Sequence, residues 1–256
     1  MPKPSHLGPE YAAQFQDASV VAAYARRPPY PPETFALLAR QVPADCRRLL
    51  DVGCGTGDLA LGLAPDVEHV DAVDASAAML AVARARPNAG GRVAWIHGAA
   101  ETAPLSPPYG LVTAGESLHW MEWKVVLPRL RAALCPAGRI AIVGRIESVE
   151  AWTGPLMALI GTYSTNRQYR PYNLVDLLAA DGLLHVDEVL RTEAAPVRMP
   201  VDRYVESMHS RNGFSRDRMD PARAEAFDAA AAALLAAHAR GGELAFGVYA
   251  SITLGR

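Results

Sequence analysis

The sequence predicts an α/β protein with one mostly parallel sheet of seven strands, helices on both faces of the sheet, and a helical lid or cap from the C-terminal half. Short apolar segments alternate with helical patterns between residues 47 and 143, which is typical of βαβ units. After residue 144 this alternation stops, and two late apolar segments are expected to form an antiparallel pair at the sheet edge.

Each predicted strand is a short apolar run bounded by polar or turn-forming residues. The predicted strands are residues 48–52, 69–74, 93–97, 111–114, 139–144, 186–190 and 244–254. The predicted helices are residues 32–41, 58–63, 76–85, 124–134, 202–208 and 220–240, with a further helical, aromatic-bearing segment at 147–180. The helix at 124–134 precedes Pro136-Ala137-Gly138, where proline cannot continue a helix and glycine permits a turn.

Composition limits the classes of partner. The net charge is −2 with 20% charged residues, so the chain lacks the broad basic field that attracts nucleic acid or an anionic membrane, and a small-molecule substrate is favoured. The first ten residues lack the apolar core of a signal peptide, and no apolar run approaches the ~20 residues that span a bilayer. Arginine far outnumbers lysine, which suggests a GC-rich bacterial coding bias. The oligomeric state is left open.

The three cysteines show no C-x-x-C spacing, which fits a reducing cytoplasm and argues against a disulfide framework. No cluster of His, Cys and Asp has the spacing of metal ligands, so we expect no metal. These features predict a cytoplasmic protein.

A glycine-rich loop carries the main functional signal. Asp51 ends the first predicted strand, and Gly53, Gly55 and Gly57 follow at alternate positions before a helix, so the backbone can approach a ligand closely. This G-x-G-x-G spacing differs from the dinucleotide fingerprint G-x-G-x-x-G, and the next residue, Asp58, would oppose a pyrophosphate.

Asp74 stands at the end of the second predicted strand, where a carboxylate accepts hydrogen bonds from both hydroxyls of a ribose. S-adenosylmethionine (SAM) has a ribose but no phosphate. Its ammonium suits Asp51, and its carboxylate suits the glycine amides. The two acids are therefore predicted to hold opposite ends of SAM.

The strings LLDVGCGTGDLALGLA and VDAVDASAAMLAVAR resemble the cofactor motifs of class I SAM-dependent methyltransferases, specifically the small-molecule group called type 11. The resemblance covers roughly residues 20–143 and implies a Rossmann-like fold. It also implies that Ala75 and Met79 flank adenine or ribose. In HGAAETAPL the family usually has an Asp that binds adenine, but this chain has Ala99, which leaves that contact to the Ala99 or Ala100 backbone, to Glu101, or to a group that the sequence does not reveal.

We therefore expect one methyltransferase domain at residues 1–256. A cofactor-binding core is expected at residues 20–145, with helical lid or cap insertions at residues 147–180 and 199–240.

The string GLVTAGESLHWM at the fourth strand also resembles this family. Methyl transfer is an in-line displacement, so the enzyme must align two reactants and, where the acceptor carries a proton, supply a base. Glu116 is expected to line the cofactor site and Trp120 the substrate site, with Ser117 beside them. His119 is the candidate base or substrate hydrogen-bonding group, the alternative being a histidine that only orients the loop.

The string YARRPPYPPE resembles a family segment that lies over the cofactor. Tyr30, held between prolines, is expected to present its ring or hydroxyl to the sulfonium, and Arg27 to meet a carboxylate. The alternative is a proline-rich connector. Ser106-Pro107-Pro108-Tyr109 resembles the signature of enzymes that methylate adenine or amide nitrogens, but it precedes the fourth strand, so we place it outside the site.

A substrate lid is expected between the fifth and sixth strands, where aromatics with arginines suit a planar or carboxylated molecule. An exposed helical face with buried aromatics is the alternative. The residues concerned are Trp152, Tyr163, Arg167, Tyr169, Arg170 and Tyr172.

The sequence thus predicts SAM-dependent methyl transfer to an O, N or C atom of a small molecule. The alternatives are an RNA or protein methyltransferase, and a SAM-binding protein that no longer transfers methyl groups. An NAD(P)-dependent oxidoreductase is disfavoured by the glycine spacing.

Overall fold

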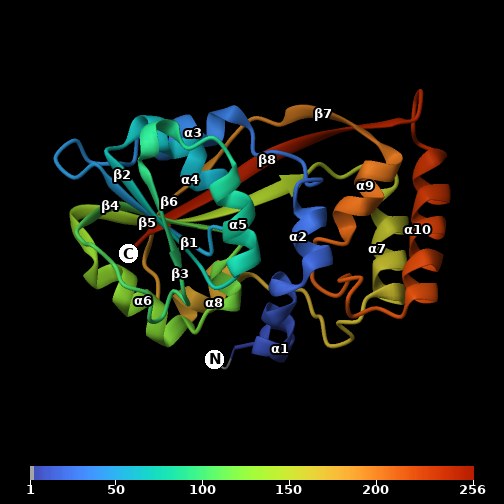
Figure 1. Ribbon diagram of the computed structural model, residues 1–256, viewed down its shortest axis with the longest axis horizontal. Coiled ribbons are helices and arrows are strands. Elements are labelled where there is room, and N and C mark those ends of the chain that lie inside the picture. The colour runs from blue at the N-terminus through green and yellow to red at the C-terminus, as the bar shows by residue number, and fades with distance from the viewer. Residues whose placement is uncertain (1–2) are drawn as a thin grey trace.

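The computed structural model describes residues 3–256 and consists of an open sheet with helices on both faces and a group of helices at one end (Figure 1). The sheet order is β3-β2-β1-β4-β5-β8-β6, and β7 also pairs with β8. The strands are β1 (Arg48–Val52), β2 (His69–Asp74), β3 (Val93–His97), β4 (Tyr109–Gly115), β5 (Leu134–Glu147), β6 (Val186–Arg191), β7 (Ala195–Pro200) and β8 (Glu243–Gly255).

Strands β1 to β5 are parallel, and β8 runs antiparallel to β5, β6 and β7. The fold is thus the expected Rossmann-like α/β architecture with a mostly parallel sheet. One strand was missed, since the described residues contain eight. The sheet nevertheless has seven positions, because β6 and β7 occupy successive stretches of the same edge of the 13-residue strand β8.

The helices follow the same alternation with the strands as far as β5. They are α1 (Pro9–Ala12), α2 (Ala18–Tyr24), α3 (Pro32–Ala39), α4 (Asp58–Leu63), α5 (Ala77–Ala85), α6 (Trp123–Ala132), α7 (Thr153–Tyr163), α8 (Leu174–Ala180), α9 (Val201–Met208) and α10 (Pro221–Ala236). No helix among residues 3–256 has both the length and the apolarity that crossing a membrane requires.

Alternation along the strands builds the two faces of the sheet. Leu49 belongs to the apolar cluster that includes Leu38 of α3, whereas its neighbour Leu50 belongs to the opposite cluster, with Leu127 of α6. Each of these four side chains is fully buried. The parallel core is therefore covered by helices on both sides.

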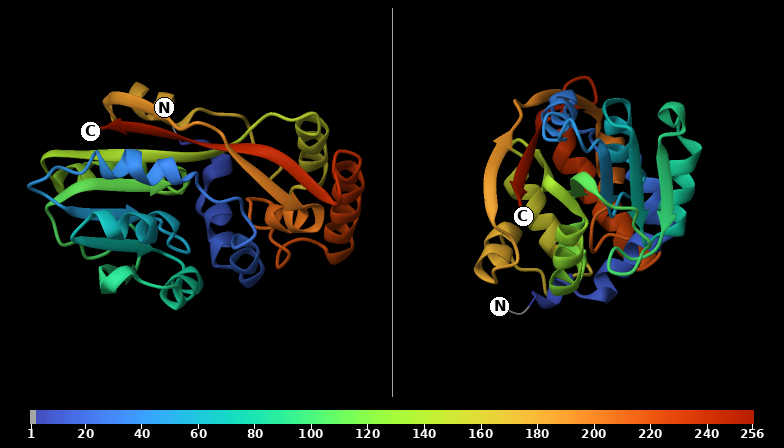
Figure 2. Two further views of the ribbon diagram at one scale, coloured as in Figure 1. Left: turned by 90° about the horizontal axis from the view of Figure 1, so that it is seen from above. Right: turned by 90° about the vertical axis from the view of Figure 1, so that its left-hand side faces the viewer.

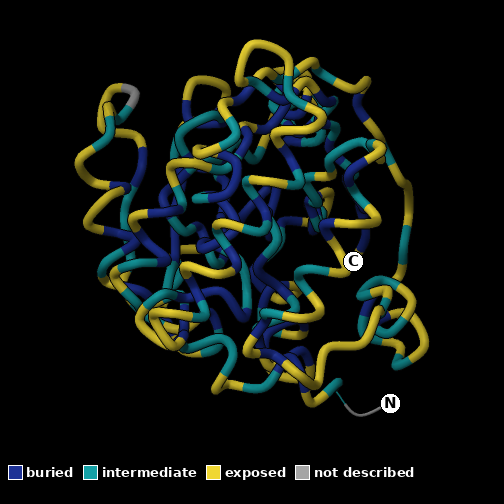
Figure 3. The backbone as a smooth tube through the Cα atoms, turned by 90° about the vertical axis from the view of Figure 1, so that its right-hand side faces the viewer, coloured by how far each residue is buried: buried dark blue, intermediate teal, exposed yellow. Residues whose placement is uncertain are grey.

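A third apolar cluster lies beyond the end of the sheet and joins α7, α9 and α10 to β7 and the start of β8. We call this unit the cap. On α10 the buried positions recur every three or four residues, so one face of the helix packs into the cap cluster. Figure 3, which views the molecule from the end that carries the cap, shows buried and exposed segments alternating along the chain. Within the expected insertion at 147–180, α8 does not join the cap: its Leu178 packs in the cluster of α6.

Candidate functional site

A cavity of about 260 Å³ opens at the carboxyl ends of β1, β2 and β4, the usual position of ligands in open α/β sheets. We call it the glycine-loop cavity. The predicted residues that line it are Gly53, Gly55, Asp74, Ala75, Met79, Ala99, Ala100, Glu116 and Trp120. The N-terminal segment closes it through Ala12, Phe15 and Tyr24, two of which precede the expected start of the core at residue 20.

The loop conformation explains the glycines. Gly53, Gly55 and Gly57 have φ angles of 65°, 55° and 86°, in the left-handed region that favours glycine. A Cβ atom on Gly53 would lie 2.4 Å from the Cβ of Ser117. Gly57 lines none of the three cavities described here. It precedes α4, and a Cβ there would meet the Trp95 ring at 2.5 Å. Gly57 therefore contributes to the shape of the loop and does not line a cavity.

Asp51 is buried, and only one of its carboxyl oxygens is paired. Oδ1 accepts a hydrogen bond from Thr113 Oγ1 at 2.8 Å, whereas Oδ2 has no partner within residues 3–256. Burial raises the pKa of this carboxyl to about 7. Asp51 lines a cavity of about 30 Å³, the deep cavity, together with Gly53, Gly55 and Glu116. An unpaired buried carboxyl oxygen suits a positively charged donor such as an ammonium group.

Asp74 ends β2 at the wall of the glycine-loop cavity. Its two oxygens accept hydrogen bonds from the backbone N–H groups of Gly55 and Ser76, each at 2.7 Å, and burial raises its pKa. Ser76 Oγ in turn accepts from the N–H of Met79 at 3.2 Å and caps α5. The acid that should hold a ribose is therefore fixed between the loop and the helix.

At the far end of this cavity, existing hydrogen bonds distinguish the three groups named above for binding adenine. The carbonyl of Ala99 already accepts from two backbone N–H groups, and that of Ala100 accepts from Arg129 Nη1 at 2.5 Å. Glu101 Oε1 accepts from the N–H of Glu122 at 2.8 Å, while its other oxygen has no hydrogen-bond partner in the described chain. The Glu101 carboxylate is thus the best acceptor at this end.

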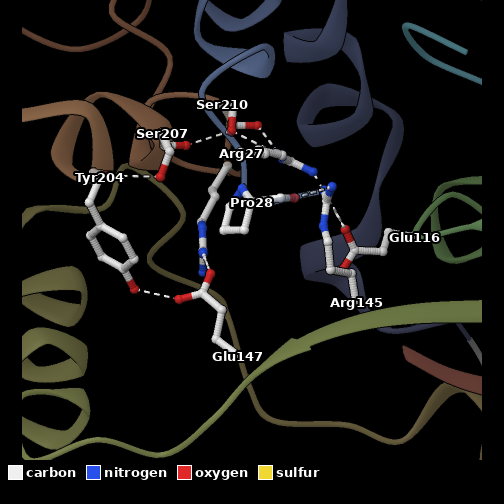
Figure 4. Close-up of polar contacts among 9 residues, drawn as sticks. Arg27, Pro28, Glu116, Arg145, Glu147, Tyr204, Ser207 and Ser210 are labelled. Carbon is white, nitrogen blue, oxygen red and sulfur yellow. Dashed lines mark hydrogen bonds and ion pairs between the residues drawn. The ribbon is translucent and has the colours of Figure 1, made fainter. Parts of the chain in front are cut away.

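Glu116 stands where all three cavities meet. Its φ angle of 50° is unusual for a residue with a side chain, and such strain is concentrated at functional sites. The carboxylate lies 3.4 Å from Arg145 Nη2 and 3.6 Å from Arg27 Nη1 (Figure 4). Two guanidinium groups therefore hold one carboxylate at the junction.

A second, larger cavity, of about 420 Å³, lies between the end of β5, the N-terminal segment and the cap. We call it the cap cavity. It shares Phe15, Tyr24, Glu116 and Trp120 with the glycine-loop cavity, so the two adjoin. Charged side chains and an apolar wall both line it. The members discussed below are Arg27, His119, Arg145, Glu147, Trp152, Leu156, Ile160, Tyr204, Arg211 and Phe246.

His119 faces the cap cavity from the short helix after β4, with its ring 4.6 Å from that of Trp120. Burial lowers the pKa of His119 to about 4, so the imidazole is neutral near pH 7. Neither ring nitrogen has a hydrogen-bond partner in the part of the chain that the structure describes. A neutral imidazole with a free lone pair can accept a proton or a hydrogen bond.

The N-terminal motif contributes differently from the prediction. Tyr30 lines the deep cavity rather than the cap cavity, and its ring faces the Arg145 guanidinium at 4.8 Å. Arg27 pairs with a carboxylate of the protein, that of Glu116, and its predicted contact with a substrate stays a prediction. Within this motif, sequence reasoning missed Tyr24, which lines all three cavities and begins the YARRPPYPPE string.

Of the six predicted lid residues, only Trp152 lines the cap cavity. Tyr163 packs against Phe227, and Tyr169 and Tyr172 pack against His6. The basic and acidic groups that do line the cavity, Arg145, Glu147 and Arg211, come from segments that no local motif connects. Because these residues lie far apart in the sequence, sequence reasoning did not predict them.

The Ser-Pro-Pro-Tyr motif lies outside the site, as its position before the fourth strand predicts. Tyr109 begins β4, is fully buried, and donates a hydrogen bond to Asp71 Oδ2 at 2.5 Å. Its neighbour Ser106 donates its N–H to the same hydroxyl. The motif therefore has a structural role here.

Comparison with known proteins agrees with this geometry. Residues 49–138 match the family model described as a methyltransferase domain. An uncharacterized methyltransferase of Mycobacterium tuberculosis is 36% identical over 146 residues, which are 56% of this chain and 58% of that protein. The match thus spans little more than half of that relative. Trans-aconitate 2-methyltransferase of Delftia acidovorans is 37% identical over 114 residues, 41% of each chain.

Among solved structures, a SAM-dependent methyltransferase from Thiobacillus denitrificans in complex with S-adenosyl-L-homocysteine has the same fold. The TM-score is 0.50 at 19% identity, and the match covers 91% of this chain and 96% of that one. Residues 49–138 are therefore similar to a methyltransferase domain, and the likeness to the solved structure shows a shared fold.

Proposed function

We propose that the protein transfers a methyl group from SAM to a small-molecule acceptor. The observation that carries this proposal is the pair of adjoining cavities, one built from the cofactor motifs and one enclosed by the cap, with Glu116 and Tyr24 in both walls. An in-line displacement requires donor and acceptor to meet at one point, and the shared wall supplies it.

The residues present fit SAM. Asp51 offers an unpaired buried oxygen to the ammonium group, Asp74 offers carboxylate oxygens to the ribose, and Glu101 offers an acceptor to the adenine amino group. Bound SAM supplies an electrophilic methyl group on a sulfonium. Around it, Phe15 and Trp120 exclude water at the junction. The neutral His119, which a pKa of about 4 makes a weak base, accepts a hydrogen bond from the acceptor atom where that atom carries a proton.

The size of the cap cavity favours a small acceptor over RNA or protein. About 420 Å³ lies within the usual range of small-molecule sites. We infer that the cap serves as the lid of this cavity, since α7 supplies one wall. The relative from Delftia is named for a small acceptor, trans-aconitate, which agrees with this choice.

Calorimetric titration with SAM and with NAD tests the cofactor assignment. Asp74→Ala should weaken SAM binding by about tenfold or more, because the variant loses two charge-assisted hydrogen bonds from the ribose hydroxyls to the carboxylate. Tight NAD binding without SAM binding would reject the proposal. A metabolite screen for SAM-dependent release of S-adenosylhomocysteine tests transfer itself. Binding of SAM with no turnover on any metabolite would favour a SAM-binding protein that transfers no methyl group.

A further inference from the structure

The cap cavity carries an excess of positive charge. Three arginines line it, Arg27, Arg145 and Arg211, against two glutamates, Glu116 and Glu147. The sulfonium of SAM would add another positive charge at the junction. A low-dielectric cavity with a net positive lining favours an anionic ligand over a neutral or cationic one.

Two of the arginines are committed to the protein. Arg27 donates from Nε and Nη2 to the side chain and carbonyl of Ser210, at 2.7 and 2.6 Å. Arg145 donates from Nη1 to the carbonyl of Pro28 at 2.7 Å, and both arginines also flank Glu116 (Figure 4). Their remaining capacity to bind a ligand is small.

Arg211 is different. Its Nη2 donates to Glu147 Oε1 at 2.5 Å, but its Nε and Nη1 donate to no group among residues 3–256, and 42% of its side chain is exposed. Glu147 is also satisfied on its other oxygen, which accepts from the Tyr204 hydroxyl at 2.5 Å (Figure 4). A guanidinium with unused donors at a cavity wall suits a carboxylate, which pairs with two N–H groups at once.

One side of the cavity wall is apolar. Trp152, Leu156 and Ile160 present one face of α7, and Phe246 of β8 adds a second aromatic ring. Such a wall binds an aliphatic or aromatic body by removing it from water.

From these features we propose that the acceptor is an amphipathic organic carboxylate, anchored by Arg211 through its carboxylate and by the α7 wall through its apolar body. The inference rests on the proposed methyl transfer. Arg211 lines only one of the two cavities, the cap cavity, whereas Glu116 lines both the cap cavity and the glycine-loop cavity. The carboxylate is therefore the anchor, and a separate nucleophilic atom near Glu116 and His119 receives the methyl group.

The test compares 3-(4-hydroxyphenyl)propionate with its primary amide, which has the same body without the charge. Each is titrated into protein saturated with S-adenosylhomocysteine. The carboxylate should bind at least about tenfold more tightly, the equivalent of one charge-assisted hydrogen bond. Arg211→Met should abolish this preference. Glu147→Gln should increase it, because it frees the guanidinium from its internal partner.

The opposite effects of the two substitutions distinguish anchoring from a structural role, which would weaken binding in both variants. Arg198→Met, an exposed arginine of β7 outside the cavity, is the control and should retain the wild-type preference. Equal binding of acid and amide by the wild type, or no binding of either, would overturn the inference. A separate SAM titration of each protein shows whether the proposed function itself has failed.

Discussion

At the scale of single residues, the buried carboxyl of Asp51 links the cofactor site to pH. Its pKa of about 7 results from burial, opposed by the hydrogen bond from Thr113. Below pH 7 the free protein holds this group protonated, and an ammonium group beside it requires the ionised form. SAM affinity should therefore rise with pH by up to about tenfold per unit until about pH 7, and then level off.

Calorimetry between pH 5.5 and 8 measures this dependence, and Asp51→Asn should remove it. The same pKa makes the stability of the free protein depend on pH in the direction opposite to SAM affinity. Between about pH 4 and 7 the folded state keeps a proton that the unfolded state releases, so stability falls as pH rises through this window. A wild-type SAM affinity that does not change with pH would contradict the placement of the ammonium group.

His119 gives the reverse dependence. Burial lowers its pKa to about 4, so the unfolded state binds a proton at pH 5 that the folded state does not. The free energy of unfolding should fall by roughly 1–2 kcal/mol between pH 7.5 and pH 5 through this residue. Because Asp51 contributes with the opposite sign, the prediction concerns the difference from the wild type: urea unfolding at both values should show a change on acidification that is more favourable to folding in His119→Gln by this amount. His185→Gln, whose side chain is 85% exposed, should show the same change as the wild type.

At the scale of elements, the local sequence pattern was enough to predict a strand where that strand is a single apolar run. The predicted bounds of β1, β2 and β3 coincide with the structure, because each strand is a short apolar segment between polar turns. β7 was missed because two prolines, Pro196 and Pro200, interrupt it. It pairs along one edge only, with β8, which is where a strand tolerates proline.

The same reasoning explains what could be predicted of the site. Asp51, the glycines and Asp74 lie on two consecutive strand-to-helix turns, so sequence spacing places them together. The cap cavity joins Arg145 of β5, Arg211 after α9 and Phe246 of β8. Only the pairing of β5 with β8 and the packing of the cap bring these together, and neither leaves a local signal.

Helix α10 allows the cap to be weakened separately from the cofactor core. Phe227 is fully buried in the cap cluster, with its ring 4.6 Å from that of Phe214. Phe227→Ala should cost about 3–5 kcal/mol by leaving a cavity. Urea unfolding measures this cost, and calorimetry should show SAM binding largely retained, because Phe227 does not belong to the clusters of the sheet. Val125→Ala, at an exposed site on α6, should have little effect.

At the scale of the whole molecule, the N-terminal segment lies between the sheet and the cap (Figure 2). It covers both cavities through Phe15 and Tyr24. Lys3 ties the start of this segment to the carbonyls of Trp120 and Met121 on the core side. Two further polar anchors reach the cap side: Asp17 accepts from Ser215 Oγ at 2.6 Å and from Arg218 Nε at 2.5 Å. The cap therefore helps to hold the cover of the glycine-loop cavity in place.

This arrangement predicts that cap contacts tune cofactor binding from a distance. Asp17→Ala removes both anchors without removing a cavity-lining group, so the segment should open more often and SAM affinity should fall by roughly tenfold, the loss of one or two hydrogen bonds to charged groups. Hydrogen exchange in residues 9–24 should become faster in the variant. In the wild type, S-adenosylhomocysteine should slow exchange in the same residues.

Asp66→Ala, an exposed acid on the sheet side, is the matched control and should change neither quantity. Faster exchange without a loss of affinity would mean that the segment covers the cofactor cavity but adds nothing to binding. Unchanged exchange would mean that Phe15 and Tyr24 hold the segment without Asp17. If the cap holds the segment over the cofactor, one opening motion controls both hydrogen exchange and SAM binding. Asp17→Ala should then lose both protection from exchange and affinity for SAM.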